Sequence, residues 1–305
     1  MDLKIVEAVQ KMETEFLDGL FSLLTRFGEE IFFICTFLIL YWCLGYNKAF
    51  KFAFFYVCSV LINGVIKAIV KRPRPWMASN TVENKLPASG LSFPSGHSQS
   101  VSAISTFVVY DIYKNKNNKK WLKITALIIA VILCLTVGFT RLYLGQHYLT
   151  DVLAGLTLGV ALMLLLNFIV AKIPENLKNK INLEVVLAIL SLIMLLAVVI
   201  VGMFDLGLSY KTTLKLFRYA AMAIGVSLGY ILSKRTIVEV YETIFIKLIK
   251  VAIGFVVTFG LYALLCIIPQ TNLFVVASCI LVVAVVATFV YPYIFNLILR
   301  KIKKD

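Results

Sequence analysis

The chain has 305 residues, of which 61% are hydrophobic and only 15% are charged. A soluble domain is about 45–50% apolar and about 25% charged, so this composition excludes a soluble enzyme, a disordered chain and a disulfide-stapled secreted domain. The apolar residues suffice for about nine membrane-spanning helices of ~20 residues each. A transporter, a channel and a membrane enzyme all remain compatible with these figures.

The formal net charge of +14 does not indicate nucleic-acid binding, because the basic residues form no single patch. They occur in short clusters between apolar runs, as in loops that face an anionic cytoplasmic leaflet. The six cysteines lie inside apolar runs without metal-ligand spacing, which indicates packing residues. We therefore expect a bilayer and no nucleic acid as partner. The sequence does not indicate an oligomeric state.

Residues 1–30 predict an amphipathic helix, because apolar residues recur every three or four positions from Ile5 to Phe27. No basic segment precedes a short apolar core, so the pattern is not that of a cleavable signal peptide. We expect this helix to lie in the membrane interface. Packing on the surface of the rest of the protein is an equal alternative.

Apolar runs make up most of the remaining chain and predict an all-α polytopic membrane bundle. Pro292 lies in the long last run, where it predicts a tilted or kinked helix. The nine runs are 31–46, 50–70, 97–112, 122–140, 148–171, 184–204, 214–233, 249–268 and 272–298.

Basic residues concentrate in one set of alternate loops and at the C-terminus, which predicts that this side faces the cytoplasm. With nine spans, the N-terminus then lies outside and the C-terminus inside. Two loops on the opposite, extracytoplasmic face break the pattern, because 71–96 and 141–147 are also basic. These two exceptions identify the region where we expect chemistry.

Both histidines of the chain, His97 and His147, lie where one of these two loops becomes an apolar helix. A single imidazole at a membrane boundary is as commonly a buried structural residue as a functional one. Three permanent cations on the same predicted face accompany this pair, namely Lys67, Arg74 and Arg141. Arginine forks suit phosphate oxygens and lysine supplies a point charge, so the set predicts an anion site.

The residues around the histidines fit this interpretation. Ser95 and Gly96 precede a predicted helix, whose free N–H groups can bind an anion that glycine lets approach the backbone. His147 and Asp151 are four residues apart and share a helix face, so the carboxylate can fix the imidazole tautomer and leave a nucleophilic nitrogen. His97 is then available as a proton donor. No carboxylate cluster suits a metal, and we expect neither a metal nor another cofactor.

These residues form three motifs: Lys67-x6-Arg74-Pro75, Pro94-Ser95-Gly96-His97 and Arg141-x5-His147-x3-Asp151. Together and in this order they resemble the signature of the type 2 phosphatidic acid phosphatase (PAP2) superfamily. The resemblance covers roughly residues 30–205 and departs from the family at Thr140, which stands in place of a serine but keeps the hydroxyl.

The resemblance implies a six-helix catalytic core over 31–205, and the remaining apolar runs add a three-helix membrane segment over 206–305. It implies that Lys67, Arg74, Ser95, Gly96 and Arg141 bind phosphate. His147 is then the nucleophile that forms a phosphohistidine, Asp151 orients it, and His97 protonates the leaving group and helps activate water. The same pocket occurs in vanadium haloperoxidases, which implies inhibition by vanadate.

We therefore expect a metal-independent lipid phosphatase, with its site on the extracytoplasmic face of a bacterial cytoplasmic membrane. Undecaprenyl pyrophosphate and phospholipid phosphates, such as phosphatidic acid or phosphatidylglycerol phosphate, are the expected substrates. One alternative is a sugar-phosphate phosphatase similar to glucose-6-phosphatase. Another is a transporter or scaffold that binds phosphate or lipid without turnover, although such a protein needs no nucleophile.

The sequence leaves the roles of two further features open. Lys71 and Arg72 either strengthen the phosphate field or bind headgroups at the interface. The 76–93 loop is placed where it could cover the site as a lid, a hypothesis that rests on position only.

A tag fused to the C-terminus should be accessible to a membrane-impermeant reagent only from the cytoplasmic side, because the basic loops place that end inside. Labelling of intact cells and of inverted vesicles measures this accessibility. Labelling of the tag in intact cells would contradict either the orientation or the odd number of spans.

Overall fold

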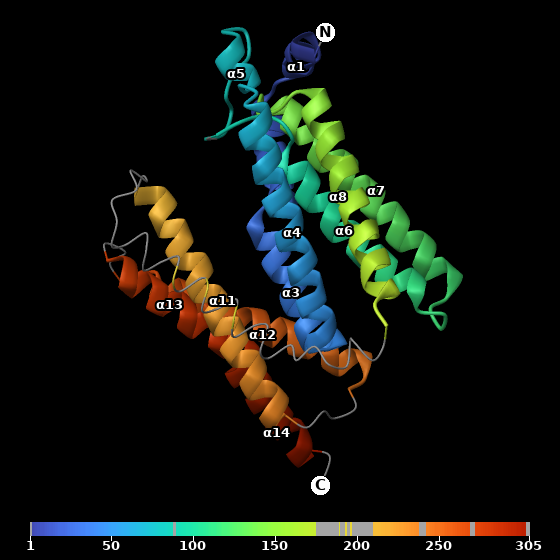
Figure 1. Ribbon diagram of the computed structural model, residues 1–305, viewed down its shortest axis with the longest axis vertical. Coiled ribbons are helices and arrows are strands. Elements are labelled where there is room, and N and C mark those ends of the chain that lie inside the picture. Colours follow the sequence, from blue (N-terminus) through green and yellow to red (C-terminus); the bar gives the residue numbers. More distant parts are fainter. Residues whose placement is uncertain are drawn as a thin grey trace. The chain divides into compact units, whose positions relative to one another are not determined.

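The computed structural model consists of helices joined by loops in the residues it describes, which are 2–87, 90–174, 189, 193, 196, 210–237, 242–268 and 272–302 (Figure 1). This agrees with the predicted all-α bundle. The helices are α1 (Asp2–Gln10), α2 (Glu15–Leu24), the 3-10 helix η1 (Thr25–Gly28), α3 (Glu30–Leu44), α4 (Tyr46–Val70), α5 (Pro75–Ala78), α6 (Gly96–Lys114), α7 (Lys120–Tyr143), α8 (Leu149–Lys172), α11 (Tyr210–Thr236), α12 (Ile244–Leu265), α13 (Leu273–Val285), the π-helical turn η2 (Val286–Val290) and α14 (Tyr291–Ile302).

The chain divides into two compact units. The first comprises Met1–Phe37 and Asn47–Ile173, and the second comprises Leu38–Tyr46 and Pro174–Asp305. The domain boundary that the sequence predicts at residue 205 lies outside the described residues, as does nearly all of the run 184–204. The other eight apolar runs each coincide with a described helix, or, for 272–298, with α13, η2 and α14 together.

Fewer than nine of these helices are by themselves long and apolar enough to cross a membrane. Five in the described part of the chain meet that condition, or six if the bent pair of Glu15–Gly28 and Glu30–Leu44 forms one span. The helix α6 does not meet it, because much of its first half is polar. Ser98, Gln99 and Ser102 of α6 are buried against protein, so a lipid-facing composition is not required there.

Two glycines let α6 and α8 pack closely in the first unit. A Cβ atom added at Gly159 would lie 2.1 Å from Ser102 Oγ and 2.5 Å from the carbonyl oxygen of Gln99. One at Gly155 would lie 2.5 Å from the carbonyl oxygen of Ser95. Small residues at this spacing allow helices in membranes to approach through their backbones. The contact brings the first turns of both helices together.

A buried amide network joins α4 to α6. The Gln99 amide nitrogen donates to the Ser59 carbonyl at 2.7 Å and to its hydroxyl at 2.8 Å. The Asn63 amide nitrogen donates to Gln99 Oε1 at 2.6 Å. Because residues four apart share a helix face, Asn63 also sets the rotation at which α4 presents Lys67.

The N-terminal segment forms two helices rather than the single predicted one, since α1 ends at Gln10 and Thr14 caps α2. Val6 of α1 is fully buried in an apolar cluster with Val82, Leu142, Tyr148 and Val152. The helix α1 therefore packs on the protein. The interfacial placement stays a prediction for α2, whose Phe16 and Leu23 are 76% and 59% exposed.

In the second unit, Pro292 gives a π-helical turn within the last apolar run. Proline has no N–H to donate to the carbonyl four residues earlier, which is that of Thr288. That carbonyl instead accepts the Tyr41 hydroxyl at 2.9 Å and the Ser233 hydroxyl at 2.7 Å. The Trp42 indole donates to the neighbouring Ala287 carbonyl at 2.9 Å. The freed carbonyls thus attach the end of α3 and α11 to this turn.

Replacing Gly159 by alanine should lower the stability of the protein by about 1–3 kcal/mol, as overpacking generally does. Thermal unfolding of detergent-purified protein measures the change. Gly64→Ala on α4 is the matched control, because nothing lies within 4 Å of a Cβ atom added there. An equal unfolding temperature for the two variants would contradict the close α6–α8 contact.

Candidate active site

The residues of the three motifs meet at one end of the first unit. Lys67 lies in the last turn of α4, Ser95 caps α6, Arg141 lies near the end of α7 and Asp151 lies in the first turn of α8. The backbone N–H of Ser95 donates to the Asp151 carbonyl at 3.0 Å. Segments far apart in the sequence are therefore in direct contact at this end.

His147 lies in the turn between α7 and α8, with Nδ1 directed toward the carboxylate of Asp151. Nδ1 is 3.6 Å from Asp151 Oδ2 and 3.4 Å from the Ser92 hydroxyl, which itself donates to Oδ2. The Tyr148 N–H also donates to Oδ2, at 2.9 Å. Both His147 and Asp151 are buried. This side of the imidazole is occupied by Asp151 and Ser92, so Nε2 is the nitrogen left for reaction.

Burial holds the pKa of His147 below its ordinary value, and the hydrogen-bond interaction with Asp151 opposes this shift. The positive charges of Arg141, Arg74 and Lys67 lower the pKa further. The imidazole is therefore neutral at neutral pH, which is the form that can act as a nucleophile.

The three predicted cations lie close enough together for their charges to act on both histidines. Lys67 Nζ donates to the Leu91 carbonyl at 2.8 Å and to the Ser92 carbonyl at 3.3 Å. Arg74 donates to the Gly90 carbonyl at 3.0 Å and to the Gln146 carbonyl at 3.1 Å. These two side chains therefore shape the loop before α6 as well as the charge of the site.

Arg141 is held differently from the other two cations. Its guanidinium is buried and donates to the Thr25 hydroxyl at 2.7 Å, while Nε has no hydrogen-bond partner in the described part of the chain. A buried charged donor that lacks a partner is unfavourable until an anion supplies one. Arg141 Nε is thus a donor that an anion such as a phosphate oxygen can accept from.

Ser95, Gly96 and His97 form the start of α6. The Ser95 hydroxyl caps the helix by accepting from the Ser98 N–H at 3.4 Å and from the Ser98 hydroxyl at 2.9 Å. The N–H groups of a first helical turn have no partner within the helix. His97 is half-buried, and Gly28 of η1 packs directly on its Cβ. The N-terminal segment therefore forms one wall of the site.

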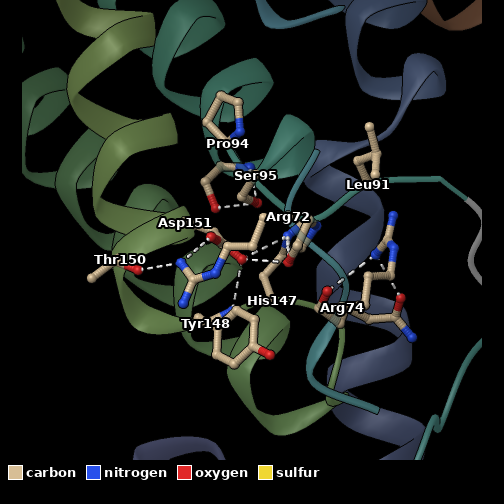
Figure 2. A network of polar contacts seen from close by, with 12 residues as sticks. Arg72, Arg74, Leu91, Pro94, Ser95, His147, Tyr148, Thr150 and Asp151 are labelled. Atoms are coloured by element: carbon tan, nitrogen blue, oxygen red, sulfur yellow. Dashed lines mark hydrogen bonds and ion pairs between the residues drawn. The ribbon is translucent and has the colours of Figure 1, made fainter. Parts of the chain in front are cut away.

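Several residues of the site were not singled out by the sequence motifs. Ser92 contacts Asp151, Thr25 contacts Arg141, and Arg72 donates to Asp151 Oδ1 at 2.8 Å (Figure 2). The sequence leaves open whether Arg72 strengthens the phosphate field or binds headgroups, and in the structure its guanidinium pairs with the Asp151 carboxylate. Ser92 stands two residues before Pro94 of the second motif, and this closeness in the chain is the one sequence signal that could have identified a residue of this set.

No three His, Cys, Asp or Glu side chains within the described residues come together in a way that could hold a metal ion.

Comparison with known proteins places these residues in a family. Residues 48–175 match the PAP2 superfamily, and residues 217–302 match the family described as the transmembrane extension of PAP2 superfamily phosphatases. Phosphatidylglycerophosphatase B of Bacillus subtilis is 38% identical over 39% of this chain and 54% of its own length. Dolichyldiphosphatase of Saccharomyces cerevisiae is 34% identical over 40% of this chain and 52% of its own length.

Among solved structures, a transmembrane PAP2-type phosphatidylglycerolphosphate phosphatase from Bacillus subtilis is 26% identical with a TM-score of 0.51. That likeness covers 57% of this chain and 86% of the other. The chain spans about half the length of the two curated relatives.

Replacing Arg141 by glutamine should weaken the binding of orthovanadate, a phosphate mimic, by about tenfold or more, since hydrogen bonds to a charged group contribute about 1.5–3 kcal/mol. Titration of the thermal unfolding temperature with vanadate measures the affinity. Arg26→Gln is the matched control, because Arg26 is exposed on the same η1 helix that contacts Arg141. Equal affinities in the two variants would remove Arg141 from the anion site.

Proposed function

The chain belongs to the PAP2 superfamily, and from this premise we propose that it is an integral-membrane lipid phosphatase that uses His147 as its nucleophile. The observation that carries the proposal is a buried imidazole that faces Asp151 and Ser92 and lies close enough to three cations to be influenced by their charges. A site that only binds phosphate needs the cations. It has no need for a nucleophile with an orienting carboxylate.

In the proposed reaction, Lys67, Arg74 and Arg141 hold the phosphate and stabilise the charge that develops on its oxygens. His147 Nε2 attacks phosphorus while the bond from phosphorus to the leaving oxygen breaks. His97 gives that oxygen a proton, which the negative charge of the bound phosphate holds on this imidazole against its burial and the neighbouring cations.

The resulting phosphohistidine is then hydrolysed. His97 takes a proton from water as the water oxygen attacks phosphorus, the P–N bond breaks and inorganic phosphate leaves. Neutral His147 is thereby restored, and His97 regains the proton that it gave to the leaving oxygen. We propose that no metal takes part, since the cations supply the charge stabilisation.

A lipid phosphate fits the surroundings of the site better than a soluble sugar phosphate. Ile69 and Val70, beside Lys67 at the end of α4, are 74% and 47% exposed, and Met77, three residues after Arg74, is 60% exposed. These exposed apolar side chains are close in the chain to Lys67 and Arg74, so an acyl or prenyl chain that extends from a bound phosphate would find apolar surroundings there. The two curated relatives are named as phosphatases of a phospholipid phosphate and of a polyprenyl diphosphate.

Phosphatidylglycerol phosphate, phosphatidic acid and undecaprenyl pyrophosphate are therefore the proposed substrates. The site would face the extracytoplasmic side of a bacterial cytoplasmic membrane, with the N-terminus outside and the C-terminus in the cytoplasm. A sugar-phosphate phosphatase remains the alternative enzyme, and a phosphate-binding transporter or scaffold the non-catalytic one. Phosphate release from the three lipids and from glucose 6-phosphate distinguishes the lipid phosphatase from these two alternatives.

Purified protein should release phosphate from at least one of these lipids in the presence of EDTA, and His147→Ala should lower the release at least about a thousandfold. Phosphate is measured for the three lipids and for glucose 6-phosphate. Thermal unfolding confirms that the variant is folded.

Substantial release by His147→Ala would exclude His147 as nucleophile, and a strict Mg²⁺ requirement would exclude the metal-free mechanism. Preference for glucose 6-phosphate would favour the sugar-phosphate alternative. No release from any substrate by folded wild-type protein would favour binding without turnover.

A further inference from the structure

The two oxygens of the Asp151 carboxylate have different partners. Oδ2 accepts from the Ser92 hydroxyl and the Tyr148 N–H and faces His147 Nδ1. Oδ1 accepts from Arg72 Nη1 at 2.8 Å. Asp151 is completely buried, so each of these contacts replaces hydration that an ionised carboxylate needs. The orientation of Oδ2 toward His147 therefore depends on what holds Oδ1.

Arg72 is itself held in a fixed position. Nη1 also donates to the Thr150 hydroxyl at 2.6 Å, and Nη2 donates to Asp2 Oδ2 at 2.9 Å. The guanidinium carbon lies 3.8 Å from the centre of the Tyr148 ring, which is a cation–π contact. Figure 2 shows the guanidinium between Thr150 and Asp151 with Tyr148 beside it. A planar fork is required to make all of these contacts at once.

Asp2 attaches the helix α1 to this arrangement. Besides its ion pair with Arg72, its Oδ1 accepts from the Thr150 N–H at 3.3 Å, and its Oδ2 accepts from the Thr150 hydroxyl. Burial of Val6 in the apolar cluster fixes α1 one turn further on. One guanidinium thus joins two carboxylates that are far apart in the sequence, one on α1 and one beside His147.

We propose that Arg72 and Asp2 are positioning residues for the phosphoryl transfer, because together they fix the carboxylate that orients His147. The inference rests on the proposed function of the site. In this proposal α1 contributes to the active site through Asp2. It also separates Arg72 from Lys67, Arg74 and Arg141: Arg72 acts on the nucleophile, whereas the other three act on the phosphate.

The proposal predicts a loss of kcat with little change in KM. Arg72→Gln should lower kcat at least about tenfold, since small misplacements of a nucleophile are costly to the rate. Its KM and vanadate affinity should stay within about threefold of wild type, unlike those of Arg141→Gln. Arg72→Lys should also lower kcat, because an ammonium keeps the charge but cannot bridge both carboxylates.

Asp2→Asn should lower kcat severalfold with the same unchanged KM. In the Arg72→Gln background it should cause little further loss, since residues of one network are not additive. Lys4→Gln is the matched control, because Lys4 is exposed on the same helix. Its kcat should equal that of wild type. Thermal unfolding of each variant confirms folding, and Asp2→Asn and Arg72→Lys keep the test available if Arg72→Gln does not fold.

The outcomes separate this inference from the proposed function. Active wild-type protein with an undiminished kcat in the folded Arg72 and Asp2 variants would overturn the positioning role alone. A rise in KM or a loss of vanadate affinity in Arg72→Gln would show that Arg72 binds the phosphate instead. Independent, multiplicative effects of the two substitutions would also overturn it. Absence of phosphate release by folded wild-type protein would overturn the proposed function and this inference with it.

Discussion

A carboxylate without exposed surface must have a hydrogen-bond or ion-pair partner for each oxygen, because burial removes the hydration that stabilises its charge. Asp151 satisfies this requirement through Ser92, Tyr148 and Arg72, which come from the loop before α6, the start of α8 and the segment after α4. His147 is adjacent to the same carboxylate. The position of the imidazole is therefore a consequence of how three segments neutralise and solvate one buried charge.

The site concentrates positive charge in the same small volume. Lys67 and Arg74 bind backbone carbonyls of the loop that they help to shape, whereas Arg141 keeps a buried donor without a partner among the described residues. Mutual repulsion of such cations opposes their burial, and an oxyanion would relieve it. In the proposed mechanism the same arrangement keeps His147 neutral and stabilises the charge on the transferring phosphoryl group. The same positive charges would thus contribute both to phosphate binding and to the reactivity of His147.

Close helix packing makes this concentration of polar groups possible. Gly155 and Gly159 bring α8 against α6, so that the Ser95 N–H reaches the Asp151 carbonyl. The N-terminal segment also contacts the site, since Thr25 contacts Arg141 and Gly28 contacts His97. Backbone approach and the N-terminal wall together exclude water from groups that would otherwise be screened. The helices α1 and η1 thus contact residues of the site, α1 through Asp2 on Arg72 and η1 through Thr25 on Arg141.

The sequence by itself determined the membrane class, eight described helices or helix groups and the residues of the three motifs. These follow from local patterns: apolar runs of membrane length, a histidine and an aspartate four residues apart, and cations at fixed short spacings. It did not reveal the break between α1 and α2, nor that α6 would be too polar to be recognised as a span by composition. Only the tertiary structure decided the partners Ser92, Thr25 and Asp2, which are 59, 116 and 148 residues from Asp151, Arg141 and Thr150 respectively. Periodicity carries information about which face of a helix a residue occupies. It carries no information about which distant segment supplies the partner of a buried charge, because that pairing depends on the packing of the whole unit.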